Sequence, residues 1–300
     1  MIRMGALFGA VVVTVAGAHA ADVEVINEAS YFPEGPLWHD GQLYYVEYSA
    51  HTLVTWDGKE NRQIWKQEGC GPSAVIEGGD GNFLITCYDA DNLVRVSTAG
   101  ATLETLAQDA DGLPFLGPND AVADAKGGVY FSASGKWDIT APIEGKIVYL
   151  AADGAIAEVA NDIHYANGLA LSPDGTTLYV SEMAAQRVLK FEVMDDGKLG
   201  RRYLFARLAD LATDPQGVDV YAGPDGLETD SAGNLYIAHF EGGRVLVADP
   251  EGTLVDIIDV PAAYVTNLTF GDSESVLFVT AATDAWTEPY PGQVYRIETR

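Results

Sequence analysis

Basic residues are scarce in this chain of 300 residues. It has 17 lysines and arginines against 44 aspartates and glutamates, which gives a formal net charge of -27. A chain this acidic repels nucleic acid and anionic lipid surfaces, so we expect neither as a partner. The charge is compatible with cation binding, although we expect most of the carboxylates to form a solvated surface.

Long hydrophobic runs are missing after the first twenty residues. Arg3 lies in a short charged start, residues 6–17 are apolar, and residues 18–20, Ala-His-Ala, match a small-x-small cleavage site. This pattern predicts a secretory signal peptide at residues 1–20, because so short an apolar run cannot span a bilayer. We therefore expect cleavage after Ala20, one mature domain at residues 21–300, export to the periplasm or the medium, and no membrane association after cleavage.

Cysteine is also rare, with two residues in the chain, Cys70 and Cys87. They flank a predicted hairpin whose fold-back brings them near each other, and an exported protein meets an oxidising compartment. A disulfide between them is one prediction, and two separate buried thiols are the alternative. Neither cysteine has a histidine nearby in the sequence, which argues against a catalytic thiol.

The chain is rich in turns that recur between alternating β-like runs. The turns are centred on Gly41, Gly81, Gly127, Gly175, Gly233 and Ser275. Repeats of 40 to 58 residues, each with three or four strands, are typical of propeller blades, because one such sheet must stack on its neighbours to bury both faces. The sequence thus predicts an all-β, six-bladed β-propeller, in which a strand at residues 23–27 completes the last blade and removes the exposed edges. A β-sandwich, the alternative, would not explain the constant phase of the repeats.

A polar residue precedes each turn by seven or eight positions. These residues are Glu34, Ser73, Asn119, Asn167, Asp225 and Asn267. If the repeats surround an axis, the six side chains lie at one level and form a ring. A ring with two carboxylates and several amide oxygens suits a hard divalent cation. Taken singly, each of these residues could instead shape a turn, since Asn-Gly and Asp-Gly pairs are common turn formers.

Five segments carry a resemblance to a known family. They are FPEGPLW at 32–38, PNDAVAD at 118–124, YANGLALSPDGTTLYV at 165–180, GPDGLETDSAGNLYIA at 223–238 and VTNLTFG at 265–271. In their order and spacing they resemble the gluconolactonase and regucalcin (senescence marker protein) family over essentially the whole mature chain. The resemblance implies a six-bladed propeller with a divalent metal at the top of the central channel, and hydrolysis of lactones.

The resemblance also assigns roles to particular positions. Glu34, Asn167 and Asp225 match the three protein ligands of the family's metal, and Asn119 matches a residue that contacts substrate or metal. Gly117 stands where sugar lactonases of the family commonly carry arginine. This departure weakens the inference to a gluconate-type sugar and leaves the hydrolytic chemistry untouched.

The chemistry of these residues leads to the same expectation. Oxygen ligands favour Ca²⁺ as the cofactor, with Mg²⁺, Mn²⁺ and Zn²⁺ as the other possibilities. Such a metal polarises a lactone carbonyl and lowers the pKa of bound water, and Asp225 is the candidate general base. We expect Asp120, which is adjacent to Asn119, to orient the ring residues without itself contacting the metal. His164 and His239 are candidate substrate-binding residues near the rim, with a structural role as the alternative for both.

Two classes of function follow from the sequence. The first is an exported, metal-dependent hydrolase of lactones or related esters, with a phosphotriesterase-like hydrolase as a variant. The second is a non-catalytic propeller that binds a ligand or protein at the same rim. Fold alone does not separate them. We expect the loops at residues 134–144 and 283–291 to decide which substrate enters.

Overall fold

The computed structural model describes residues 22–299 except for 79–80, 110 and 213–220. Strands dominate these residues, and the helical elements are a 3-10 turn, η1 (Met183–Ala185), and a single helical turn, α1 (Leu208–Leu211). Within the described part, no helix has the length and apolar character needed to cross a bilayer. The predicted signal peptide at residues 1–20 lies outside the described residues.

Four sheets have four strands each, in sequence order and antiparallel. The first contains β2 (Pro33–His39), β3 (Gln42–Glu47), β4 (Thr52–Trp56) and β5 (Asn61–Lys66). The second contains β6 (Pro72–Glu77), β7 (Phe83–Cys87), β8 (Asn92–Val96) and β9 (Thr102–Leu106). The third contains β10 (Pro118–Ala123), β11 (Val129–Ala133), β12 (Gly145–Leu150) and β13 (Ile156–Ile163). The fourth contains β14 (Ala166–Leu171), β15 (Thr177–Glu182), β16 (Arg187–Val193) and β17 (Leu199–Arg207).

The remaining strands form one eight-stranded sheet. Its first half contains β18 (Gly223–Thr229), β19 (Leu235–Phe240), β20 (Arg244–Ala248) and β21 (Leu254–Asp259). Its second half contains β22 (Tyr264–Phe270), β23 (Val276–Ala282), β24 (Pro291–Glu298) and β1 (Val23–Tyr31). One residue pair, Phe240 opposite Tyr264, joins the halves. The described strands therefore form five hydrogen-bonded sheets, and not the six separate sheets that six repeats predict, because backbone pairing continues from β19 into β22.

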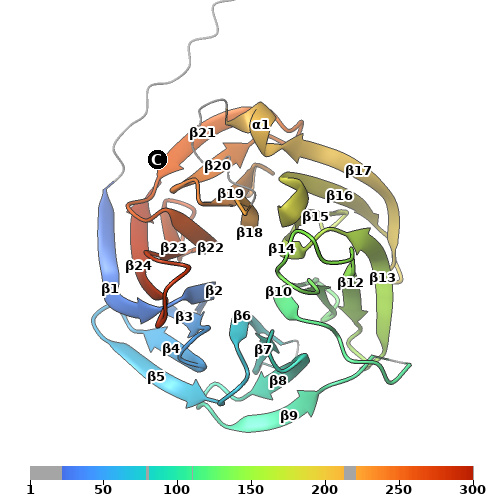
Figure 1. Cartoon of the computed structure of the whole chain (residues 1–300), viewed down its shortest axis with the longest axis horizontal. Helices are drawn as coiled ribbons and strands as arrows, with labels where there is room; N and C mark the ends of the chain where they lie inside the picture. The colour runs from blue at the N-terminus through green and yellow to red at the C-terminus, as the bar shows by residue number, and fades with distance from the viewer. Residues whose placement is uncertain (1–21, 79–80, 110, 213–220, 300) are drawn as a thin grey trace, which may run out of the picture.

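The sheets are arranged around an axis, as in a propeller (Figure 1). Strands β2, β6, β10, β14, β18 and β22 lie nearest the axis, and each contacts the next in turn, with β22 back against β2. The N-terminal strand β1 pairs with β24, with Val23 opposite Ile297. The prediction of an all-β propeller-like fold is thus confirmed.

The hydrophobic core lies between neighbouring sheets. Val46 and Leu53 of the first sheet pack in one cluster with Ile85 and Val94 of the second, and all four side chains are fully buried. Outer strands are different: most residues of β9 are exposed, whereas every residue of β7 is buried. The inner strands of each sheet are thus buried on both faces against the neighbouring sheets, whereas the outer strand is exposed to solvent.

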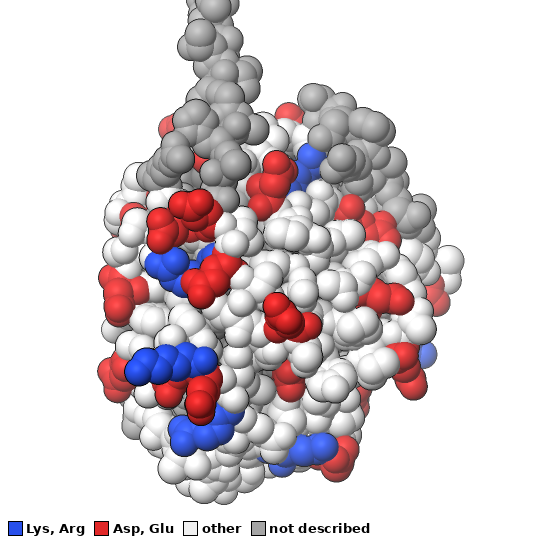
Figure 2. Space-filling view, turned by 90° about the vertical axis from the view of Figure 1, so that its left-hand side faces the viewer, with Lys and Arg blue, Asp and Glu red and all other residues white. Residues whose placement is uncertain are grey.

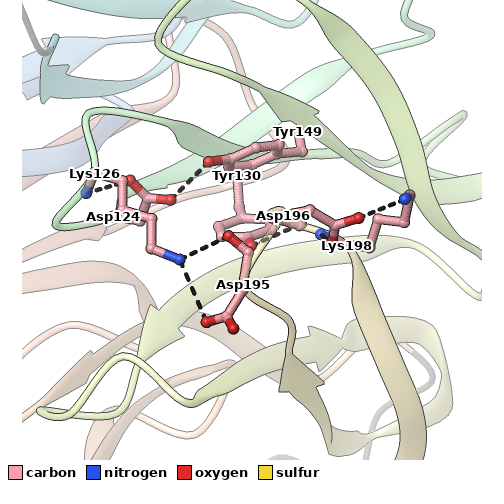
Figure 3. Close-up of polar contacts among 8 residues, drawn as sticks. Asp124, Lys126, Tyr130, Tyr149, Asp195, Asp196 and Lys198 are labelled. Atoms are coloured by element: carbon pink, nitrogen blue, oxygen red, sulfur yellow. Dashed lines mark hydrogen bonds and ion pairs between the residues drawn. The ribbon is translucent and has the colours of Figure 1, made fainter.

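Polar contacts join the third and fourth sheets at their turns (Figure 3). Tyr130 donates a hydrogen bond to the carbonyl of Gly197 at 2.8 Å, and Lys126 donates to the carbonyl of Asp195 at 2.8 Å. Tyr149 donates to a carboxylate oxygen of Asp124 at 2.7 Å. The bonds of Tyr130 and Lys126 thus attach the third sheet to the turn between β16 and β17, whereas the bond of Tyr149 braces the β10–β11 turn within the third sheet.

The surface carries the excess of acidic residues in a dispersed form. Figure 2 shows carboxylates scattered over one face, with lysines and arginines between several of them. Ion pairs such as Arg296 with Glu298, at 3.2 Å, are partly exposed and therefore contribute little to stability. On this face the acidic side chains are thus dispersed and exposed to solvent.

The disulfide predicted from the sequence is present. Cys70 and Cys87 are bonded, and both are fully buried in the core between the first two sheets. The bond connects the segment before β6 to the end of β7, and thereby closes a loop with a sequence separation of 17 residues. It holds the start of β6, the strand that carries Ser73, against its hairpin partner.

Removal of this bond should lower the stability of the whole domain. For the double variant Cys70→Ser and Cys87→Ser, we expect a loss of about 3 kcal/mol in the free energy of unfolding, because the cross-link lowers the conformational entropy of the unfolded chain and its removal restores that entropy. Urea unfolding of oxidised wild type, reduced wild type and the variant measures it. If the reduced wild type unfolds at the same urea concentration as the oxidised one, the disulfide has no stabilising role.

Candidate functional site

A cavity of about 850 Å³ opens at one end of the inner strands. Five of the six polar residues picked out by the repeat phase line it: Glu34, Ser73, Asn119, Asn167 and Asp225. Each is at least nine-tenths buried and comes from a different inner strand, in the order β2, β6, β10, β14 and β18. The structure therefore brings together all four residues expected to hold the metal.

Irregular strand pairing places these side chains at the axis. In each of the five strands the register with the hairpin partner shifts at or directly after the ring residue, for example between Ala166 and Leu169 and between Pro224 and Leu227. Bulges of this kind turn a side chain away from the regular alternation of the strand. They explain how residues in otherwise apolar inner strands point into one polar cavity.

Asn267 does not belong to this ring, contrary to the expectation from its phase. Its side chain lines a smaller cavity at another part of the inner strands, and its Oδ1 accepts a hydrogen bond from the Leu268 N–H at 2.8 Å. In β22 the register shift falls before Asn267, between Val265 and Asn267, so Thr266 occupies the unpaired position. A shift of one residue moves a side chain to the opposite face of a strand, which accounts for the difference.

Glycines after the ring residues allow the inner strands to approach closely. A Cβ at Gly35 would lie 2.2 Å from the Ala74 Cα, and one at Gly168 would lie 2.1 Å from the carbonyl oxygen of Asp225. The Glu-Gly and Asn-Gly pairs thus lie within strands and do not form turns. Close packing of backbone around the axis requires glycine at these positions.

Glu34 and Asp225 carry the negative charge of the ring. Burial raises the pKa of Glu34 well above its usual range, and repulsion from Asp225 and Asp120 adds to the effect. Burial likewise raises the pKa of Asp225, with repulsion from Asp120 next, while a hydrogen bond from Asn167 opposes the rise. Among the described residues, neither carboxylate forms an ion pair with a lysine or arginine.

Buried hydroxyl groups hold the backbone of the ring residues, and sequence reasoning missed this role. The Ser73 hydroxyl donates to the Asn119 carbonyl at 3.0 Å, and the Thr86 hydroxyl donates to the same oxygen at 2.5 Å. Ser181 donates to the Asp225 carbonyl at 2.7 Å. In each case one sheet fixes the inner strand of the next. A signal exists in the sequence, because Ser or Thr recurs near the end of the second strand of most repeats.

Asp120 connects two inner strands behind the ring. Its carboxylate accepts hydrogen bonds from the N–H groups of Leu169 and Ala121, both at 2.9 Å, so it ties β10 to the strand that carries Asn167. Burial raises its pKa to about 6. This arrangement agrees with the orienting role expected from the sequence.

The two histidines proposed as substrate contacts are not among the residues that line the cavity. His239 is buried, and its Nδ1 accepts a hydrogen bond from Arg244 at 3.3 Å. The backbone N–H of His164 donates to Glu182 at 2.9 Å. Both residues have structural contacts here, and contact with a substrate stays a prediction.

The donor set of the ring fits a hard cation. No cluster of three or more His, Cys, Asp or Glu side chains with metal-binding geometry occurs in the described part of the chain. The ring offers instead two carboxylates, Glu34 and Asp225, and two amide side chains, Asn119 and Asn167. Oxygen donors of this kind suit Ca²⁺ or Mg²⁺, and a cation would offset the repulsion between the two acids.

The rim of the cavity comes from the two loops expected to decide substrate entry. Lys136 and Trp137 belong to the β11–β12 loop, whereas Trp286 and Tyr290 belong to the β23–β24 loop, and all four line the cavity. Phe32, Tyr48 and Tyr88, which directly follow β1, β3 and β7, complete an upper wall that is largely aromatic. The cavity thus has a polar, acidic floor and an aromatic mouth.

Glu228, three positions after Asp225 on β18, lines the smaller cavity together with Asp120 and Asn267. Burial raises its pKa from 4.5 to about 7, while hydrogen bonds from Thr229 and Thr269 oppose the rise. Between these two pH values the folded protein binds a proton that the unfolded chain releases. The free energy of unfolding is therefore not lowered by Glu228 below pH 4.5, and it falls as the pH rises toward 7.

The variant Glu228→Gln should not show this fall in the free energy of unfolding, because its amide does not ionise. In metal-free protein at pH 8 we expect the variant to be about 1 to 3 kcal/mol more stable than wild type, with the difference gone at pH 4.5. Denaturant unfolding in chelator across this pH range measures it, and Glu24→Gln on the exposed outer strand β1 controls for the loss of a surface charge. An equal difference at both pH values would show that the pKa of Glu228 is not raised by folding.

Comparison with known proteins agrees with this geometry. Residues 32–283 match the family described as SMP-30/Gluconolactonase/LRE-like region. The 6-deoxy-6-sulfogluconolactonase of Pseudomonas putida is 28% identical over 265 residues, which cover 86% of each chain. Pentonolactonase XacC of Haloferax volcanii is 27% identical over 268 residues, covering 87% of this chain and 85% of that protein.

A solved structure has the same fold. Regucalcin of Agrobacterium tumefaciens, a calcium-binding protein, aligns with a TM-score of 0.76 at 22% identity, over 94% of this chain and 95% of its own. The matched family region includes all four candidate metal ligands, from Glu34 to Asp225. The chain therefore belongs to the SMP-30/gluconolactonase/LRE-like family.

Proposed function

We propose that this protein is an exported, metal-dependent hydrolase of lactones or related esters. The observation that carries the proposal is the pair of buried carboxylates, Glu34 and Asp225, that face one cavity beside the amides of Asn119 and Asn167. Relatives that align over most of the chain are named as lactonases, which supports hydrolysis of a small lactone.

Ca²⁺ is the cation that we propose for the site. Glu34, Asn167 and Asp225 would hold it, with Asn119 as a fourth ligand or as a contact to substrate. Carboxylate and amide oxygens are typical ligands of calcium, and Mg²⁺ and Mn²⁺ accept the same donors, whereas zinc prefers sites with nitrogen or sulfur ligands. When bound, the cation would polarise the carbonyl of the substrate and acidify a neighbouring water.

The side chains around this site have separate roles in the hydrolysis of the substrate. The Asp225 carboxylate takes a proton from the attacking water, whose oxygen forms a bond to the carbonyl carbon. The ring C–O bond then breaks, and the departing oxygen takes up a proton to give a hydroxy acid. Asn167 donates to Asp225 and so fixes the direction in which that carboxylate points. Ser181 and Asp120 hold the backbones of β18 and β14 in place during this step.

We infer six blades for the propeller, with β1 closing the last one. The eight-stranded sheet divides into two halves of four strands that share one residue pair, and β22 contacts β2 across the point where the chain closes. Six inner strands in cyclic contact support one blade for each repeat.

Export is also part of the proposal. Residues 1–20 have the composition of a signal peptide, and the Cys70–Cys87 disulfide is typical of a protein from an oxidising compartment. Mass spectrometry of the protein from a cell fraction outside the cytoplasm should show a chain that begins at Ala21. A full-length chain in the cytoplasm would contradict export.

A lactone panel with and without chelator tests the function. We expect hydrolysis, followed by acid release, that stops in chelator and returns with Ca²⁺. Hydrolysis that persists after complete metal removal would overturn metal dependence. Turnover of an aryl ester or a fluorophosphate in place of lactones would assign the related esterase chemistry, and no turnover of any compound with metal bound would favour a binding propeller.

Asp225→Asn separates the two roles of this side chain. The amide keeps an oxygen ligand but loses the charge and the basicity, so we expect a modest loss of metal affinity and a fall in turnover by a factor on the order of 10² to 10⁴. Asn167→Ala should mainly weaken metal binding and recover in excess metal. Calorimetric titration and turnover at saturating metal measure both effects.

Glu228→Gln is the matched control, since this buried carboxylate of the same strand faces the smaller cavity. It should keep wild-type turnover. A fully active Asp225→Asn variant at saturating metal rules out the base assignment. Unchanged metal affinity in both Asp225→Asn and Asn167→Ala rejects the ring as the metal site.

A further inference from the structure

Two tryptophans from distant parts of the chain meet at the mouth of the cavity. Trp137, in the β11–β12 loop, stacks on Trp286, in the β23–β24 loop, with ring centroids 5.4 Å apart and an interplanar angle of 21°. Phe240 packs edge-on against Trp137 at 5.6 Å. Although it is part of this stack, the Trp286 side chain remains 49% exposed. Exposed aromatic surface at the wall of a cavity is a typical place for an apolar group of a ligand.

Several polar groups of the upper wall are already bonded to the protein. Tyr48 donates to Asp89 at 2.9 Å, and Tyr88 donates to the carbonyl of Gly135 at 2.7 Å. Ser49 donates to the carbonyl of Pro289 at 2.9 Å, and the Nδ1 of His51 accepts from the N–H of Gly71 at 3.1 Å. At these four side chains the hydroxyl groups of a ligand would leave water and find few open partners, which costs binding free energy.

The described lining also lacks a guanidinium group, whose planar fork of donors could hold neighbouring hydroxyls, and the charged side chains of its wall are Lys136, Asp89 and Glu288. None of the described lining residues is an arginine. At Gly117 the space beside the backbone is filled by the ring of Tyr88, because a Cβ there would lie 2.8 Å from the Tyr88 Cε2. A tyrosine ring therefore occupies the space that a side chain at position 117 would need, next to the start of β10.

We propose that the substrate of this site is a lactone or ester with a flat or extended apolar substituent, and that Trp137 and Trp286 bind that substituent. The proposal rests on the proposed hydrolase function and goes further by giving the substrate class. The carbonyl would lie at the acidic floor near Asp225, and the aryl or alkyl group would lie against the indoles at the mouth. A polyhydroxylated sugar lactone would meet the same aromatic wall with its hydroxyls.

Six-membered lactones that share one ring and differ in substituent test this directly. The set is δ-valerolactone, which has no substituent, a phenyl- and a pentyl-substituted δ-valerolactone, and glucono-δ-lactone. With wild-type protein and saturating Ca²⁺, we expect kcat/KM for the phenyl and pentyl compounds to exceed that for glucono-δ-lactone by about 100-fold. A higher kcat/KM for glucono-δ-lactone than for either apolar compound would overturn the proposal.

Variants at the two tryptophans assign the binding group. We expect Trp286→Ala and Trp137→Ala each to lower kcat/KM for the phenyl compound by about 10-fold or more, mainly through KM, and to leave δ-valerolactone nearly unchanged. Trp286→Phe should retain most of the preference, which separates loss of an aromatic face from misfolding of the loop. Tyr203→Ala, a partly exposed aromatic on the outer strand β17, is the control. Equal losses for both substrates would show that the tryptophans do not bind the substituent.

A binding measurement separates this proposal from the proposed function. The corresponding six-membered lactams resist hydrolysis, so their affinity can be measured by quenching of tryptophan fluorescence whether or not the protein is an enzyme. Binding of the phenyl lactam that Trp286→Ala weakens about 10-fold supports the substrate class even if no lactone is hydrolysed. Hydrolysis of lactones with no preference for apolar substituents would instead leave the hydrolase function in place and reject this inference.

Discussion

Burial of two acidic side chains at the axis is the constraint on which this structure depends. Burial raises the pKa of both Glu34 and Asp225, repulsion from Asp225 adds to the effect at Glu34, and no basic side chain of the described residues pairs with either. A protein keeps such groups only where the surrounding bonds hold them in place or a cation offsets their charge. The site has features of both kinds: the hydroxyls of Ser73, Thr86 and Ser181 and the carboxylate of Asp120 fix the ring backbones, and the oxygen donors suit a divalent metal.

The propeller supplies this geometry because each sheet is anchored to the next. Apolar clusters between sheets set their spacing, and hydroxyl groups such as those of Thr86 and Ser181 then fix the neighbouring inner strand. Bulges turn the ring residues toward the axis, since a regular strand would point alternate side chains into the sheet interface. The floor of the cavity is therefore rigid, while its mouth is made by loops, which can vary without disturbing the core.

Much of the candidate site could be predicted from the sequence because it follows the repeat. The spacing of seven or eight positions between a polar residue and the next turn identified Glu34, Asn119, Asn167 and Asp225, and the structure places all four in one cavity. The same rule failed at Asn267, where the register of β22 changes one residue earlier and turns this side chain to the smaller cavity. His164 and His239 do not occupy the polar position that recurs in each repeat. Their places in the structure depend on local packing, which the periodicity of the sequence does not describe.

The sequence by itself determined the strand-rich repeats, the hairpin turns and the acidic surface, because these follow from alternation, turn chemistry and composition. For Cys70 and Cys87 it left a disulfide and two separate thiols as alternatives, and the structure shows the disulfide. Only the tertiary structure decided how the sheets join, through the pair of Phe240 and Tyr264, and that Trp137 and Trp286, from the two loops expected at the rim, stack on each other. Trp137 and Trp286 are far apart in the chain, so no local pattern could bring them together. Their contact depends on the curvature of the whole ring, which is set by the summed packing between sheets.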